Sequence, residues 1–228
     1  LTVADDGSYI LLSQGEKIFK IDTATAWAGG SDNQDRIQHT WALPDSYGGI
    51  YAEKLRVNSI AILPDGSRAY AAMNYNRAYS VGNINGGLAN AFAVLDLQTL
   101  GQPVITSLTK PTMDGVKPNW VAAAPDSSAI YVANRKDGSS RVWRVGVPSG
   151  SPKELSQGGS SYSNAVLSGD GSRFFTTKTS SYGTYFEVYD TTNGSISEID
   201  YTYVYIDAAV QIPNKNSHGY NQPSLVVS

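Results

Sequence analysis

The chain is built from short alternations of apolar and polar residues that recur in one order. An apolar strand runs into a tight polar turn, and a second apolar strand follows it. The four turns are Asp5-Asp6-Gly7-Ser8, Pro64-Asp65-Gly66-Ser67, Pro125-Asp126-Ser127-Ser128 and Gly169-Asp170-Gly171-Ser172. Proline presets φ, aspartate bonds its own backbone and glycine accepts positive φ, so these sequences predict four hairpins.

Each hairpin is expected to begin a unit of four strands. The first two strands of the units are 1–4 and 9–12, 59–63 and 69–72, 120–124 and 129–133, and 165–168 and 174–177. The third strands are 17–22, 91–96, 141–145 and 185–190, and weaker fourth strands follow at 37–41, at 104–108, around Leu155 and at 196–199. No segment carries a sustained 3.6-residue apolar stripe with caps, so helix content should be near zero.

Four antiparallel strands, repeated at roughly 45–60 residues, predict an all-β fold, a β-propeller built from four-stranded antiparallel blades. The blade repeats are placed near 1–58, 59–118, 119–163 and 164–222, and 223–228 begins a further strand. A β-sandwich is the alternative, although its strands need not repeat one turn sequence at one position. The residues expected to pack between blades are Val3, Ile60, Ile62, Val94, Val121, Trp143, Val166 and Val188.

The third and fourth units carry a recognisable repeat sequence. Ala129-Ile130-Tyr131-Val132-Ala133-Asn134 follows Pro125-Asp126, and Phe186-Glu187-Val188-Tyr189-Asp190-Thr191-Thr192-Asn193-Gly194 forms a strand ending in a polar turn. These runs resemble the YVTN-type propeller repeat, whereas the first two units lack its Tyr-Val-x-Asn run. The resemblance implies a propeller of the kind found in surface-layer and periplasmic binding proteins and in lactonase-like enzymes.

Both ends of the chain match the innermost strand of a unit. Leu1-Thr2-Val3-Ala4 opens the first unit, and Pro223-Ser224-Leu225-Val226-Val227-Ser228 has the same apolar pattern. We expect the chain to be a piece of a longer polypeptide with six or seven blades, and residues 223–228 to contact a further polypeptide, because proteins normally cover apolar edge strands. The alternative is a small ring of four or five blades in which 201–210 adds strands.

Binding residues are expected at the end of the blades opposite the tight turns. Strand alternation gathers the irregular loops there, and 42–58, 74–90 and 200–222 exceed the about 12–15 residues above which a loop is usually functional or disordered. Tyrosine and asparagine suit recognition, although they also populate ordinary solvated loops. The candidates are Tyr47, Tyr51, Tyr75, Asn76, Arg77, Tyr79, His218, Tyr220 and Asn221.

Three asparagines form a second, smaller regularity. Asn58, Asn119 and Asn164 stand at the start of three first strands. They would ring the mouth of a propeller channel. Capping of the loop-to-strand turn by the asparagine side chain explains them equally well.

Composition narrows the function classes. Hydrophobic residues make up 41% of the 228 residues, which is enough for a core, and the net charge of −3 without a basic cluster argues against nucleic-acid binding. No apolar run is long enough to span a membrane, and the absence of cysteine excludes disulfides. Few charged residues (16%), 15 Tyr and 22 Gly suggest an extracellular, cell-surface or periplasmic protein.

Catalytic and metal-binding patterns are missing from the sequence. His39 and His218 have no carboxylate at metal-ligand spacing, and 32–35 lacks the glycine and distal glutamate of a calcium loop. We therefore predict no catalytic residue, no metal and no cofactor. The leading hypothesis is a non-enzymatic binding or scaffold module that presents a loop-rich propeller face to a protein or glycan partner. The alternatives are a lactonase-like or dehydrogenase-associated propeller enzyme and a structural subunit of a surface layer or filament.

Overall fold

Two compact units make up the chain, Leu1–Ala123 and Ala124–Ser228. The computed structural model describes residues 1–26, 36–44, 46–47, 50–52, 55–75, 78–79, 91–107, 118–134, 140–148, 150, 152–158, 161–180, 183–192, 196–201, 214–215 and 221–222. The C-terminal segment 223–228 lies outside these residues, so its contact with a further polypeptide stays a prediction.

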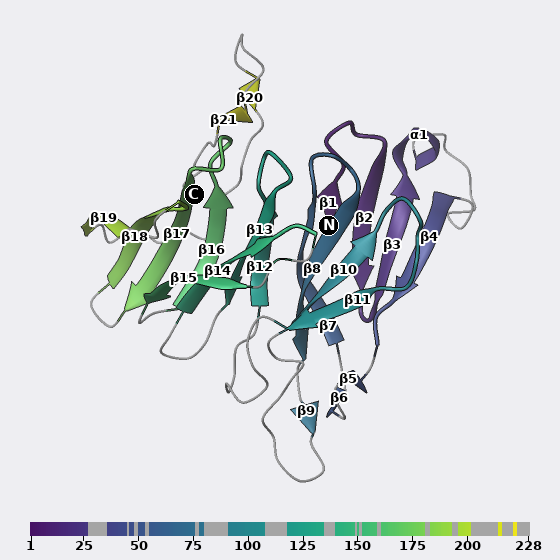
Figure 1. Ribbon diagram of the computed structural model, residues 1–228, viewed down its shortest axis with the longest axis horizontal. Coiled ribbons are helices and arrows are strands. Elements are labelled where there is room, and N and C mark those ends of the chain that lie inside the picture. Colours follow the sequence, from purple (N-terminus) through teal and green to yellow (C-terminus); the bar gives the residue numbers. More distant parts are fainter. Residues whose placement is uncertain are drawn as a thin grey trace. The chain divides into compact units, whose positions relative to one another are not determined.

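Among the described residues, the main architecture is four four-stranded antiparallel sheets, named here blades one to four (Figure 1). Blade one has the order β1 (Thr2–Val3), β2 (Tyr9–Gln14), β3 (Lys17–Asp22), β4 (Ile37–Ala42). Blade two has the order β7 (Leu55–Ile62), β8 (Arg68–Tyr75), β10 (Ala91–Asp96), β11 (Val104–Ser107). Blade three has the order β12 (Pro118–Ala123), β13 (Ala129–Asn134), β14 (Ser140–Gly146), β15 (Lys153–Gly158). Blade four has the order β16 (Ser161–Leu167), β17 (Arg173–Ser180), β18 (Gly183–Asp190), β19 (Ile196–Tyr201).

These strands confirm the fold class and the four repeats expected from the sequence. All sixteen strands expected for the four units are present, and several extend beyond the apolar run that predicted them. The further strand expected at 223–228 lies outside the described residues. The expectation of almost no helix is also confirmed for the described residues, in which α1 (Thr23–Ala26) is a single helical turn after β3.

The four tight turns share one hydrogen-bond pattern. In blade two, the Asp65 carboxylate accepts the Ser67 backbone N–H at 2.9 Å, and Gly66 N–H donates to the Leu63 carbonyl at 2.8 Å. A further bond of 3.0 Å runs from Leu97 N–H, after the third strand, to the Ser67 carbonyl. The matching bonds in the other blades run from the serine backbone N–H to the aspartate carboxylate. They are Ser8 to Asp6 at 2.9 Å, Ser128 to Asp126 at 3.0 Å and Ser172 to Asp170 at 3.0 Å. Each turn therefore accepts a backbone hydrogen bond from the residue that follows the third strand of its own blade.

The residue after the turn aspartate is left-handed in every copy. The φ angles are 71° at Gly7, 69° at Gly66, 58° at Ser127 and 72° at Gly171. Glycine adopts this conformation without a steric penalty, which explains why the motif uses it. In blade three a serine holds the same backbone, so this turn carries strain that the other three avoid.

The core of the first unit lies between blades one and two. Leu11, Ile18 and Trp41 of blade one pack with Ile60, Ala71 and Met73 of blade two. The Trp41 indole N–H donates to the Gly101 carbonyl at 3.0 Å, which satisfies the polar atom of a ring that is only 1% exposed.

The first strands of blades two and three are also linked. The backbone N–H of Val121 in β12 donates to the Ser59 hydroxyl of β7 at 3.3 Å, and this hydroxyl lies 3.4 Å from the Val121 carbonyl. Adjacent first strands therefore lie side by side, as blade packing requires.

The expected core is mostly confirmed, with one error. Ile60, Val121, Trp143 and Val188 are buried, and Ile62, Val94 and Val166 are partly buried. The assignment of Val3 to the core is wrong, because its side chain is 50% exposed. Register explains the difference: β1 pairs Thr2 with the buried Leu11 and Val3 with Ile10, so alternation turns Val3 to the face away from the Leu11 core.

The segments expected to be irregular loops contain additional strands. β5 (Ser46–Tyr47), β6 (Ile50–Ala52) and β9 (Ala78–Tyr79) form a three-stranded sheet outside the blades. In Figure 1 this sheet lies at the end of the first unit opposite α1. In the second unit, β20 (Asn214–Lys215) pairs with β21 (Asn221–Gln222) as a short two-stranded sheet. The sequence did not predict these strands, because two- and three-residue strands show no periodicity.

Candidate functional site

The two long segments of the first unit leave the blades at the same end. β4 ends at Ala42, which pairs with Lys17 at the start of β3. β8 ends at Tyr75, which pairs with Leu55 at the start of β7. The tight turns lie at the other ends of these strands, so the connections 42–58 and 74–90 start opposite the turns, as strand alternation predicts.

Backbone pairing brings together three of the predicted binding residues. The β6–β9 ladder places Tyr51 opposite Tyr79, and the β5–β6 ladder places Tyr47 opposite Ile50. These strands come from the two segments that the sequence proposed separately as binding loops. Their pairing makes one continuous strip of backbone at the loop end of the first unit.

The structure describes only two of the other loop candidates. Tyr75 is the last residue of β8, and Asn221 pairs with Lys215 in the second unit. Asn76, Arg77, His218 and Tyr220 lie outside the described residues. Their part in binding stays a prediction.

The three asparagines lie within strands. Asn58 is the unpaired residue of an irregularity between Val57 and Ser59 in β7, and its side chain is exposed. Asn164 lies in a similar irregularity of β16, and Asn119 is the second residue of β12. Two of the three therefore interrupt strand pairing in comparable places, and a role at a channel mouth stays a prediction.

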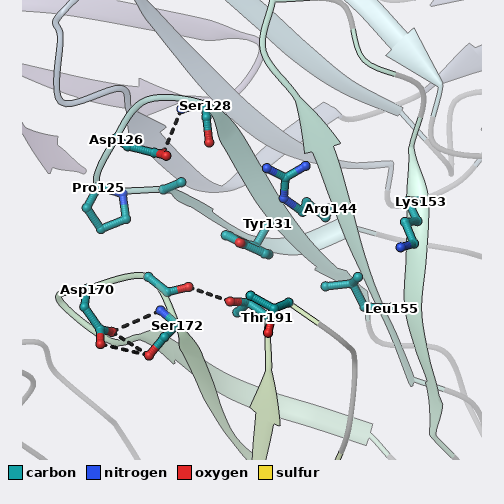
Figure 2. Close-up of a pocket in the computed structure, with 13 residues that line it drawn as sticks. Pro125, Asp126, Ser128, Tyr131, Arg144, Lys153, Leu155, Asp170, Ser172 and Thr191 are labelled. Carbon is teal, nitrogen blue, oxygen red and sulfur yellow. Dashed lines mark hydrogen bonds between the residues drawn. The ribbon is translucent and has the colours of Figure 1, made fainter.

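A cleft of about 510 Å³ lies in the second unit between blades three and four (Figure 2). One wall is formed by Tyr131, Arg144 and Lys153 of blade three. The other is formed by the tight turn of blade four together with Thr191. The sequence predicted binding residues at the opposite end of the blades, so the cleft is a candidate site that sequence reasoning missed.

Tyr131, Arg144 and Lys153 form a row across three neighbouring strands. Arg144 of β14 pairs with Tyr131 of β13 on one side and with Lys153 of β15 on the other. Residues directly opposite each other in antiparallel strands project from the same face of the sheet. Because like charges at such positions are destabilising, a negative group bound between the two cations would be favourable.

Two aspartates at the edge of the cleft are engaged by their own turns (Figure 2). The backbone bond from Ser128 lowers the pKa of the Asp126 carboxyl from its ordinary value, with a smaller contribution from Arg144. Hydroxyl and backbone bonds from Ser168 and Ser172 lower the pKa of Asp170. Both groups therefore remain carboxylates near neutral pH and brace their turns, which makes them poor general acids.

Comparison of equivalent positions between the repeats would have revealed this site. Five residues after the turn aspartate, blades two and three both have tyrosine, Tyr70 and Tyr131. The residues paired across the sheet from Tyr70 are Val94 and then Val104. Blade three thus has an arginine and a lysine where blade two has two valines.

The part of the chain that the structure describes contains neither a metal-binding cluster nor a membrane-spanning helix. This part has no cluster of three or more histidine, aspartate or glutamate side chains placed to hold a metal ion. The helix described there, α1, is a single turn, and no helix in this part is long and apolar enough to cross a membrane.

Similarity to known proteins appears at the level of structure. No protein-family model and no curated protein match the chain. Hydrazine synthase of Kuenenia stuttgartiensis matches with a TM-score of 0.60 and 15% identity, over 87% of this chain and 48% of that one. TolB of Acinetobacter baumannii matches with a TM-score of 0.51 and 18% identity, over 85% of this chain and 41% of that one. The dihydro-heme d1 dehydrogenase NirN matches with a TM-score of 0.57 and 14% identity, over 87% of this chain and 36% of that one.

This chain therefore spans less than half the length of each of these three proteins. At such low identities, the similarity establishes the fold and leaves activity open. Together with the four meandering antiparallel blades, it shows that the chain has the β-propeller fold.

Proposed function

We propose that this chain is a non-enzymatic binding or scaffold module that presents the loop end of its blades to a protein or glycan partner. The observation that carries the proposal is the β5–β6–β9 sheet, in which two segments far apart in sequence pair outside the blades. Paired strands are already ordered before a partner arrives, so less conformational entropy is lost on binding. Tyr47, Tyr51 and Tyr79 in these strands are of the residue type that recognition surfaces favour.

The proposal extends to the kind of protein and its location. We assign the chain to the YVTN-type repeats, as part of a larger propeller in an extracellular, cell-surface or periplasmic protein. The Ala129–Asn134 strand after the Pro125-Asp126 turn supports the repeat type. The tyrosine- and glycine-rich, charge-poor composition supports export. In a larger propeller, residues 223–228 would pair with the continuation of the chain or with another subunit.

The test removes the paired loop strip and leaves the blades. Residues 75–87 are replaced by Gly-Asn, and a milder double variant carries Tyr51→Ser and Tyr79→Ser. Ser127→Gly, in a tight turn of the second unit, is the control. Each purified variant is applied to a glycan array and to an array of folded proteins, and circular dichroism reports whether its blades remain folded.

The proposal requires at least one ligand that binds the wild-type chain and the Ser127→Gly control but not the loop variants. Equal binding by folded loop variants would contradict it. A lactone panel, with and without divalent metal, tests the enzymatic alternative, and turnover by the wild-type chain would overturn the non-enzymatic assignment. Concentration-dependent growth of ordered assemblies in sedimentation, without ligand binding, would favour a structural subunit instead.

A further inference from the structure

We propose that the cleft between blades three and four binds the carboxylate of a small hydroxylated acid, of the kind presented by a uronic acid sugar, through Arg144 and Lys153. This site lies in the second unit and shares no residue with the loop strip. It therefore stands or falls independently of the binding function proposed above.

Neither the Arg144 guanidinium nor the Lys153 ammonium is in ion-pair contact with a carboxylate of the described residues, although Arg144 lies near enough to Asp126 to help lower the pKa of its carboxyl. The equivalent residue of blade one, Lys20, differs because its ammonium lies 4.4 Å from the centroid of the Tyr9 ring. A cation on an aromatic face is partly stabilised, whereas two adjacent cations over an open cleft favour an external anion.

The nearest internal carboxylates do not supply that anion. Asp126 accepts the Ser128 backbone N–H at 3.0 Å. Asp170 accepts the Ser172 backbone N–H at 3.0 Å and the Ser168 hydroxyl at 2.6 Å. Figure 2 shows the bonds from Ser128 to Asp126 and from Ser172 to Asp170 on the turns, away from Lys153. Both aspartates are therefore fixed at the edge of the cleft, and the arginine fork remains open to a ligand.

These aspartates also favour a carboxylate over a phosphate. Phosphate sites commonly use free backbone N–H groups, but the turn amides at Ser128 and Ser172 already donate to their own aspartates. Two fixed negative charges repel a dianion more strongly than a monoanion. The planar guanidinium of Arg144 matches a carboxylate through two parallel hydrogen bonds.

The cleft has room for more than the carboxylate. Its volume of about 510 Å³ lies within the range of about 300–1,000 Å³ that is typical of small-molecule sites. Leu155 and Pro125 add apolar surface to the lining. Thr191 donates its hydroxyl proton to the Gly171 carbonyl at 2.6 Å, so its oxygen can still accept a hydrogen bond. An apolar wall and a hydroxyl acceptor suit a sugar ring.

The test uses glucuronate as the probe, with glucose as its neutral counterpart and inorganic phosphate as the competing anion. Isothermal titration measures each ligand against the full 228-residue chain. The main variant, Arg144→Val with Lys153→Val, installs the residues that blade two carries at the same positions, Val94 and Val104. Lys20→Val removes a cation from the equivalent position of blade one and is the matched control.

Glucuronate should bind the wild-type chain and the Lys20→Val control, and weaken at high salt because the site is electrostatic. Its Kd should rise at least about tenfold in the double variant, and glucose should not bind. The single variants Arg144→Gln and Lys153→Gln keep the test decisive if the double variant fails to fold. Failure of glucuronate to bind, equal binding of phosphate, or unchanged affinity in folded variants would overturn the proposal.

Discussion

Gly171 in the tight turn of blade four lies directly against Pro125 in the turn of blade three. A β-carbon added to Gly171 would stand 2.6 Å from the Cδ of Pro125, which is closer than two non-bonded carbon atoms approach each other. The same addition at Gly66 would meet no atom within 4 Å. Two turns with nearly the same φ, 72° and 69°, therefore have different surroundings.

This difference predicts unequal effects of the same substitution. Gly66→Ala should cost about 1–2 kcal/mol of unfolding free energy, because alanine is strained at positive φ. Gly171→Ala carries the same strain and also displaces the ring of Pro125, so it should cost about 1–3 kcal/mol more. Urea unfolding of both variants measures the difference. Equal losses of unfolding free energy in the two variants would show that Gly171 is not in contact with Pro125.

Ser127 predicts a stabilising substitution. It occupies the glycine position of the turn with φ 58°. Ser127→Gly removes a left-handed backbone strain of about 1–2 kcal/mol. Glycine also increases the conformational entropy of the unfolded chain, which lowers stability by about 0.4–1 kcal/mol. A net gain of about 0.5–1 kcal/mol is therefore expected in thermal unfolding. Gly66→Ser makes the reverse change where space is open, and it should be destabilising. A loss of stability in Ser127→Gly would contradict the strain.

The blades could be predicted from the sequence because their determinants are local. A strand such as Lys17–Asp22 alternates with period two, and its turn carries aspartate and glycine at fixed positions. Both signals are read within about ten residues of chain, which is why the expected and observed bounds of β3 and β10 coincide.

The candidate sites depend on pairing over distance, which the sequence does not display. Nothing in the local pattern indicates that Tyr51 lies opposite Tyr79, since their strands are two or three residues long. Val3 was misassigned for a related reason, because its face is set by register with Ile10. The Arg144–Lys153 pair is different: it was visible in principle, as a departure from the valines of blade two.

Val121 and Val3 provide a direct test of the corrected core. Val121 is 3% exposed and lies in β12 beside β7, whereas Val3 is 50% exposed. Val121→Ala should destabilise the chain by about 1–3 kcal/mol, since it leaves a cavity in a packed region. Val3→Ala should stay within about 0.5 kcal/mol. Chemical denaturation compares the two, and a larger loss at Val3 would restore the original assignment of that residue to the core.

The turn aspartates predict how stability changes in acid. The pKa of Asp65 lies below its ordinary value of 3.8, chiefly because the carboxylate accepts the Ser67 backbone and hydroxyl hydrogens. Asp6, Asp126 and Asp170 are lowered in the same direction by equivalent bonds. A lowered pKa in the folded state means that the unfolded chain takes up protons first as the pH falls. The stabilisation from these turns is therefore complete above the unfolded value and is lost as the pH falls through the folded one.

Asparagine keeps the acceptor oxygen but does not titrate in this range, so it isolates the effect. The fourfold variant should lose less stability than the wild type between about pH 4 and pH 2. Its substitutions are Asp6→Asn, Asp65→Asn, Asp126→Asn and Asp170→Asn. The control is Asp5→Asn, which removes a neighbouring charge and leaves the bond from Asp6 to Ser8 intact. Thermal unfolding across this pH range gives the comparison. If the fourfold variant and the wild type lose stability in parallel, the turn bonds do not stabilise the fold through their charge.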